Sequence, residues 1–158
     1  MKRIALVCAA ALLWIAAGHA QNRGNDPDQK ELYSYVLSMD KIKKLGGATH
    51  DMQEFAKKHS DLDQGNGGDA KDLNDMVAKL QKYPEAVSIL NRNGLTPREY
   101  AVGFFTLLQA SMAVGFKKSG AYKEYSPKML QLVSRQNLDF VEQHFDEIKK
   151  LTNMGGDQ

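Results

Sequence analysis

The chain has 158 residues, of which 21 are Lys or Arg and 19 are Asp or Glu, a formal net charge of +2 at pH 7. Its single cysteine, its single tryptophan and two of its basic residues lie within positions 1–20, so positions 21–158 carry no net charge and no cysteine. That composition excludes disulfides, thiol catalysis, thiolate metal sites and covalent c-type haem from positions 21–158, and it offers no basic face for nucleic acid.

Positions 1–20 have the three parts of a secretory signal peptide. Lys2 and Arg3 form a basic start. An uncharged apolar run extends from Ile4 to Ala17, and small residues follow up to Ala20. The run is too short for a membrane-spanning helix, which needs about 20 apolar residues, so we expect cleavage after Ala20, not a retained anchor. The protein is then periplasmic or secreted.

The remainder of the chain is long enough for one domain, because a chain of this size buries roughly two thirds of its surface. We expect a signal peptide at 1–20, a flexible segment at 21–25, one helical domain at 26–152 and a disordered tail at 153–158.

Two helices are predicted at the start of the domain. Asp26-Pro27 is an N-cap followed by proline at the first helical position. Apolar residues at steps of three and four then form one stripe from Leu32 to Leu45. Gly46-Gly47 is expected to stop this helix, and a weaker helix is expected over about 49–59.

Turn-forming residues delimit the next two helices. The stretch 60–68 is rich in Gly, Asp and Asn and is expected to be a loop. We expect Asp69 to cap a third helix. Tyr83-Pro84 ends that helix, because the residue before proline avoids the helical region. A short helix follows, and Asn93-Gly94 closes it.

The clearest local signal in the chain begins at Thr96. This residue is a predicted N-cap, Pro97 takes the first helical position, and Glu99 completes a capping box. The helix is expected to run to about Lys118. Residues 101–116 are uncharged and apolar on every face, which is typical of a helix buried in a core or in a membrane. They reach about 24 Å, less than the roughly 30 Å of a bilayer core, so we expect the central core helix.

The sequence pattern is less regular at the end of the domain. Residues 121–133 give no clear pattern, because Pro127 interrupts the apolar residues. A last helix is expected from about Ser134. Its apolar stripe consists of Leu138, Val141, Phe145, Ile148 and Leu151. No stretch alternates as a strand does. The expected fold class is therefore all-α, a single-domain helical bundle of about five helices around a buried central helix at about 97–118.

Two stretches resemble a group of small exported (periplasmic) bacterial proteins of all-α fold with no assigned activity. One runs from Gly94 to Tyr100 and continues into the apolar helix; the other runs from Asn137 to Val141. The resemblance implies export and a helical fold, and it assigns no functional residue. Leu95-Thr96-Pro97-Arg98-Glu99 is also similar to the Leu-Thr-x-x-Gln motif of periplasmic Spy-like chaperones, with Glu99 at the glutamine position and a single copy.

Acidic residues after position 60 are the main candidates for a metal site. Four aspartates fall at the first, third, ninth and twelfth positions of a calcium loop: Asp61, Asp63, Asp69 and Asp72. The match is incomplete, because Asn66 stands where the sharp turn needs glycine and Asp72 is shorter than the usual bidentate glutamate. We favour a solvated loop and expect no cofactor, with calcium binding as the alternative.

Haem is a second alternative. Met39 on the first predicted helix and His144 on the last occupy elements comparable to those that ligate b-type haem in cytochrome b562-like bundles. A helical chain with seven methionines offers such a pair readily, and His144 precedes Phe145 of the apolar stripe, so we expect His144 to point into water.

Three polar or aromatic groups complete the candidates. His50, Asp51 and Glu54 fall within one helical turn. The acidic residues Asp139, Glu142 and Asp146 recur at steps of three and four. Both patterns are typical of a solvated helix face, the second one salt-linked to neighbouring basic residues. An apolar groove is the third possibility, lined by Tyr33, Tyr35, Tyr122 and Tyr125, although packing in the core explains these tyrosines as readily.

No Gly-x-Ser-x-Gly or His-Glu-x-x-His motif occurs. We therefore expect a non-enzymatic exported protein that binds a partner protein or a small apolar ligand, or that counteracts envelope stress. We expect it to bind no nucleic acid and to insert in no membrane after cleavage. A calcium- or haem-binding periplasmic helical protein is the alternative.

Overall fold

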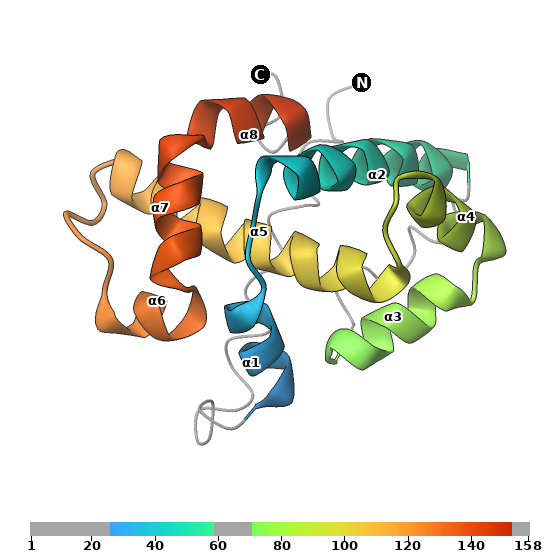
Figure 1. Cartoon of the computed structure of the whole chain (residues 1–158), viewed down its shortest axis with the longest axis horizontal. Coiled ribbons are helices and arrows are strands. Elements are labelled where there is room, and N and C mark those ends of the chain that lie inside the picture. The colour runs from blue at the N-terminus through green and yellow to red at the C-terminus, as the bar shows by residue number, and fades with distance from the viewer. Residues whose placement is uncertain (1–25, 59–70, 153–158) are drawn as a thin grey trace, which may run out of the picture.

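The computed structural model describes residues 26–58 and 71–152, which form eight α-helices and no β-strand (Figure 1). The all-α class is confirmed, with eight helices where about five were expected. The predicted signal peptide, the flexible segment at 21–25 and the tail at 153–158 lie outside the described residues. Within the described part, none of the helices combines the length and apolar character that crossing a membrane requires.

The first predicted helix is interrupted. It is divided into α1 (Pro27–Ser34) and α2 (Met39–Lys58), and residues 35–38 are not helical. The fully buried Asn137 explains the break. Its side chain accepts a hydrogen bond from the Leu37 amide at 2.9 Å and donates one to the Tyr35 carbonyl at 2.7 Å. A side chain therefore satisfies these backbone groups in place of helical hydrogen bonds. This contact cannot be predicted from local sequence, because Asn137 is distant along the chain.

The expectation that Gly46-Gly47 stops a helix is wrong, because both glycines lie inside α2. A Cβ atom at Gly46 would overlap the carbonyl oxygen of Leu151 and lie 3.1 Å from its carbonyl carbon. A Cβ atom at Gly47 would lie 2.5 Å from Oδ1 of Asn93. The missing side chains therefore let α8 (Phe145–Thr152) and the residue after α4 approach the α2 backbone closely.

Two short helices follow the stretch 59–70, which lies outside the described residues. The N-cap of α3 (Leu73–Gln81) is Asp72, whose carboxylate accepts from the Asp75 amide at 2.7 Å, so Asp69 is not its cap. Tyr83-Pro84 separates α3 from α4 (Pro84–Arg92) as predicted. Gly94 closes α4 with a φ of 68°, a left-handed conformation that glycine adopts readily.

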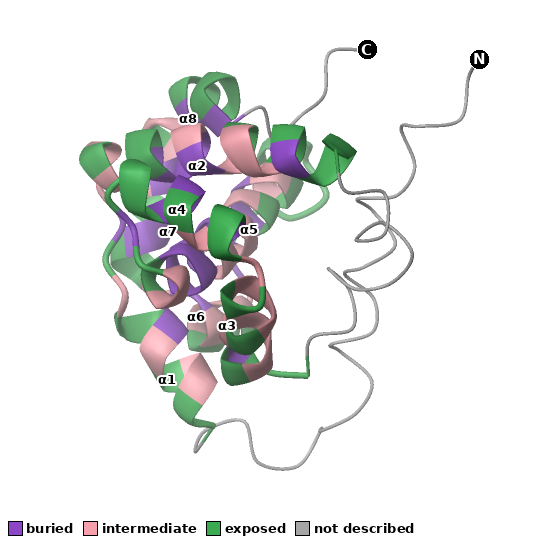
Figure 2. Ribbon diagram, turned by 90° about the vertical axis from the view of Figure 1, so that its right-hand side faces the viewer, coloured by how far each residue is buried: buried purple, intermediate pink, exposed green. Residues whose placement is uncertain are grey.

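The helix α5 (Pro97–Lys118) begins as predicted. The Thr96 hydroxyl accepts from the Glu99 amide at 3.2 Å, and the Glu99 carboxylate accepts from the Thr96 amide at 2.9 Å. It packs against α1, α2, α3, α4 and α7. Burial is one-sided, however, because Leu107 is fully buried whereas Phe116 is 45% exposed. Figure 2 shows buried segments gathered where the helices face one another.

The last predicted helix is also interrupted. After α6 (Pro127–Leu132), Ser134 caps α7 (Arg135–Gln143), and α8 begins only after His144, whose φ of −108° and ψ of 17° are not helical. The break lets α7 lie across α5 while α8 runs beside α2 (Figure 1). The predicted stripe is accordingly divided, and Leu151 is exposed.

Candidate functional site

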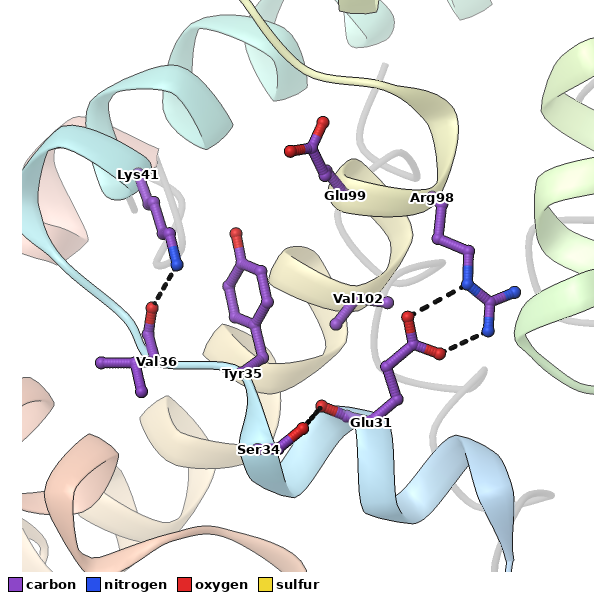
Figure 3. Close-up of a pocket in the computed structure, with 8 residues that line it drawn as sticks. All are labelled: Glu31, Ser34, Tyr35, Val36, Lys41, Arg98, Glu99 and Val102. Carbon is purple, nitrogen blue, oxygen red and sulfur yellow. Dashed lines mark hydrogen bonds and ion pairs between the residues drawn. The ribbon is translucent and has the colours of Figure 1, made fainter.

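A surface pocket of about 380 Å³ opens where the end of α1, the linker 35–38 and the first turns of α2 and α5 meet (Figure 3). The break between α1 and α2 creates it, because the extended linker supplies one wall. The pocket is lined by Glu31, Ser34, Tyr35, Val36, Lys41, Arg98, Glu99 and Val102.

An ion pair forms one rim of the pocket. The guanidinium of Arg98 donates to both carboxylate oxygens of Glu31, with Nε to Oε1 at 3.0 Å. This hydrogen bonding raises the pKa of Arg98. Arg98 also donates from Nη1 to the side chain of Asn74 at 2.5 Å. One side chain thus ties α1, α3 and α5 together, and its charge is already neutralised by Glu31.

The opposite rim carries the ammonium group of Lys41. Lys41 Nζ donates to the Val36 carbonyl at 2.7 Å and lies 4.1 Å from the centroid of the Tyr35 ring. Among the described residues it forms no ion pair. Lys41 is therefore a fixed positive charge, held over an aromatic ring and beside the pocket.

The Tyr35 phenol and the Glu99 carboxylate lie between these rims (Figure 3). The Thr96 amide holds the pKa of Glu99 below its usual value, and Lys44 and Lys41 add to this shift. Burial raises the pKa of Tyr35, and the Glu99 carboxylate adds to the rise. At neutral pH the pocket therefore contains a neutral phenol and an anionic carboxylate.

The floor of the pocket is apolar. Val102 is 2% exposed, and the Tyr35 ring lies above α5 (Figure 3). Gly103 makes room for that ring, because a Cβ atom there would lie 3.1 Å from the Tyr35 hydroxyl oxygen. The lining includes no histidine, and the Ser34 hydroxyl donates to the Glu31 carbonyl at 3.1 Å. The lining therefore combines apolar surface with charged side chains.

The predicted calcium loop falls mostly outside the described residues. Asp61, Asp63 and Asp69 belong to the stretch 59–70, and Asp72 is the N-cap of α3. In the described ranges, no group of three His, Cys, Asp or Glu side chains is placed to hold a metal ion.

Both predicted haem ligands, Met39 and His144, lie in the described part of the chain. Met39 is the first residue of α2 and is partly buried. His144 lies between α7 and α8, with 31% of its side chain exposed. Its ring is 5.0 Å from that of Phe140, and its Nδ1 is 3.6 Å from a carboxylate oxygen of Glu147.

Most members of the two acidic groups have partners of their own. Asp51 accepts from the Asn93 side chain at 3.1 Å, and Glu54 pairs with Lys57. In the second group, Arg135 pairs with Asp139 at 2.9 Å, the salt link expected on that helix face.

Glu142, on the same face, forms its hydrogen bonds with residues outside α7. It accepts from Lys117 of α5 at 2.7 and 2.8 Å and from the Tyr125 hydroxyl at 2.8 Å, so it joins α5 to α7. Of the four tyrosines proposed to line a groove, only Tyr35 lines the pocket, and Tyr122 contacts Phe116 instead.

No protein-family model, curated protein or solved structure matches this chain. The resemblance to small exported bacterial proteins therefore stays a prediction, and the site is interpreted from its own geometry.

Of the residues that line the pocket, the sequence pattern places only Tyr35 at a binding site. The pattern places Arg98 and Glu99 in the first turn of a helix, and Glu99 does complete the capping box there. Glu31 and Lys41 carry no signal in the sequence, because they reach the pocket only through the break at 35–38.

Proposed function

We propose that this chain is an exported, non-enzymatic binding protein whose ligand site is the pocket between α1, α2 and α5. In this proposal α5 is the central helix of the domain, and its first turns support the pocket floor. The observation that carries the proposal is a concave surface with an apolar floor and the ammonium group of Lys41, which forms no ion pair with a described residue (Figure 3).

The apolar part of the ligand would lie against the floor. Tyr35 and Val36 offer a ring and a branched side chain, of which Val36 is 42% exposed, and the buried Val102 completes the floor. Covering apolar surface of this kind is favourable by about 25 cal/mol per Å². A small ligand with an apolar body fits this part of the pocket.

The polar part of the ligand would be acidic. The guanidinium of Arg98 is already paired with Glu31, whereas Lys41 forms no ion pair with a described residue. A ligand carboxylate or sulfonate beside Lys41 would gain a charge-assisted hydrogen bond. We therefore specify the ligand as a small apolar molecule with one acidic group.

The exported location rests on positions 1–20, with their basic start, uncharged apolar run and small-residue exit. The non-enzymatic part rests on the lining of the pocket, which holds no paired nucleophile and base.

Two related dyes test the binding site. We expect anionic 1-anilinonaphthalene-8-sulfonate to bind with increased fluorescence, and Val36→Trp to weaken binding by filling the mouth of the pocket. Lys41→Gln should weaken binding of the anionic dye by about tenfold, in line with the roughly 1.5–3 kcal/mol of a hydrogen bond to a charged group. The uncharged analogue N-phenyl-1-naphthylamine should be unaffected by Lys41→Gln.

The matched control is Tyr33→Trp, which adds an indole at an exposed α1 position that does not line the pocket. Equal loss of dye binding in Tyr33→Trp and Val36→Trp would contradict the assignment, as would unchanged binding in Val36→Trp.

A further inference from the structure

Apolar side chains are exposed together where α5 ends. Met112, Phe116 and Tyr122 have 37%, 45% and 46% of their surface exposed. Met112 and Phe116 are one helical turn apart, and the rings of Phe116 and Tyr122 meet edge to face with centroids 5.9 Å apart. Tyr122 belongs to the α5–α6 connection, at the left edge of Figure 1. We call these three residues the α5-end patch.

Exposed lysines accompany this patch. Lys118, Lys123 and Lys128 are exposed, and Glu124 is the one acidic residue between positions 118 and 128, a formal net charge of +2. None of the three lysines forms an ion pair with a described residue. Lys118 Nζ instead lies 4.9 Å from the Phe145 ring centroid. The segment is thus locally cationic, although positions 21–158 as a whole carry no net charge.

Aromatic rings near ammonium groups that form no ion pair with a described residue match the boundary of an anionic bilayer. Rings of this kind lie at the level of the lipid headgroups, and lysines near the surface are attracted to the lipid phosphates. The rings here belong to a helix end and a short connection, which can enter the headgroup layer while the domain stays folded. An apolar patch that is rimmed by charge marks an interaction site.

We propose that the α5-end patch docks the folded domain onto the surface of an anionic phospholipid membrane. The docking is peripheral, with the apolar side chains in the headgroup region and the lysines on lipid phosphates. This surface is separate from the α1–α2–α5 pocket, so membrane docking and ligand binding can be tested and can fail independently.

Co-sedimentation with lipid vesicles tests the proposal. The protein is used in the form recovered from cells, so that residues 1–25 make the same contribution in every sample. We expect binding to phosphatidylglycerol vesicles, weaker binding to phosphatidylcholine vesicles, and a decrease as salt is added. Phe116→Ser with Tyr122→Ser should lower the partition coefficient by about tenfold. Lys118→Gln with Lys123→Gln should lower it by about fivefold per lysine on phosphatidylglycerol.

The control is Tyr33→Ser, which removes an aromatic ring that is 44% exposed on α1 and should leave vesicle binding unchanged. The melting temperature of each variant verifies that it is folded. The absence of binding to phosphatidylglycerol at low salt would overturn the proposal and leave an acidic protein as the occupant of the patch. Equal binding to both lipids, or an equal loss in Tyr33→Ser, would also overturn it.

Discussion

Single side chains decide how the helices of this protein approach one another. Gly46 lets the backbone of α8 lie against α2, and Asn137 of α7 holds the linker between α1 and α2. Neither role is visible from sequence neighbours, since the partners are distant along the chain in both cases.

Gly46→Ala should destabilise the fold. The new methyl group would overlap the Leu151 carbonyl, so α8 must move or strain, and overpacking of this kind costs about 1–3 kcal/mol. Urea denaturation measures the free energy of unfolding. The control is Gly115→Ala, where the nearest atom would be 3.9 Å away and the gain in helix propensity should stabilise by up to about 1 kcal/mol. Equal effects of the two substitutions would contradict the close approach of α8.

Asn137→Ala should also lower the free energy of unfolding. It leaves the Leu37 amide and the Tyr35 carbonyl without their buried partner, and an unsatisfied buried group costs about 1–3 kcal/mol. Denaturant titration is again the measurement, with Asn91→Ala at an exposed position of α4 as the control, expected within about 0.5 kcal/mol of the wild type. Because the linker forms a pocket wall, dye binding should weaken in Asn137→Ala and not in Asn91→Ala.

The helices themselves show which features were predictable from sequence. The start of α5 at Thr96, the division at Tyr83-Pro84 and the closure at Gly94 agree with prediction, because caps and turns depend on adjacent residues. The breaks at 35–38 and His144 were missed, because the apolar period continues through both. The pocket was missed for the same reason, since it exists only where the first helix is interrupted.

The contact between α5 and α7 should be sensitive to acid. Hydrogen bonds from Lys117, then from Tyr125, hold the pKa of Glu142 below the 4.5 of an unperturbed glutamate. A carboxyl whose pKa is lower in the folded state stabilises the fold above the unfolded pKa, and this contribution is lost as pH falls through the folded pKa. The wild type should therefore exceed Glu142→Gln in stability at pH 7, and the difference should shrink below about pH 4.5.

Urea denaturation at pH 7, 4.5 and 3 measures this difference. Asp146→Asn, at an exposed position of α8, is the matched control and should change the free energy of unfolding by no more than about 0.5 kcal/mol. A stability difference between wild type and Glu142→Gln that stays constant from pH 7 to pH 3 would show that the carboxylate charge does not matter.

The whole molecule is proposed to be exported and to bind its ligand outside the cytoplasm. If positions 1–20 are removed as a signal peptide, the remaining neutral, cysteine-free chain would carry its pocket outside the cytoplasm. N-terminal sequencing of the protein from the exported fraction should begin at Gln21. Retention of Met1 on protein found in the cytoplasm would contradict this part of the account. Replacing Leu12 and Leu13 in the apolar run with arginine should abolish export.

The claim that the pocket binds a small acidic, apolar ligand is tested most directly by mapping where such a molecule binds. The measurement is the change in backbone amide chemical shifts on titration with 1-anilinonaphthalene-8-sulfonate. Binding in the pocket should produce the largest changes at Tyr35, Val36 and Val102, and these changes should be smaller in Lys41→Gln. Changes confined to α3 and α4, or to the α5-end patch, would contradict it.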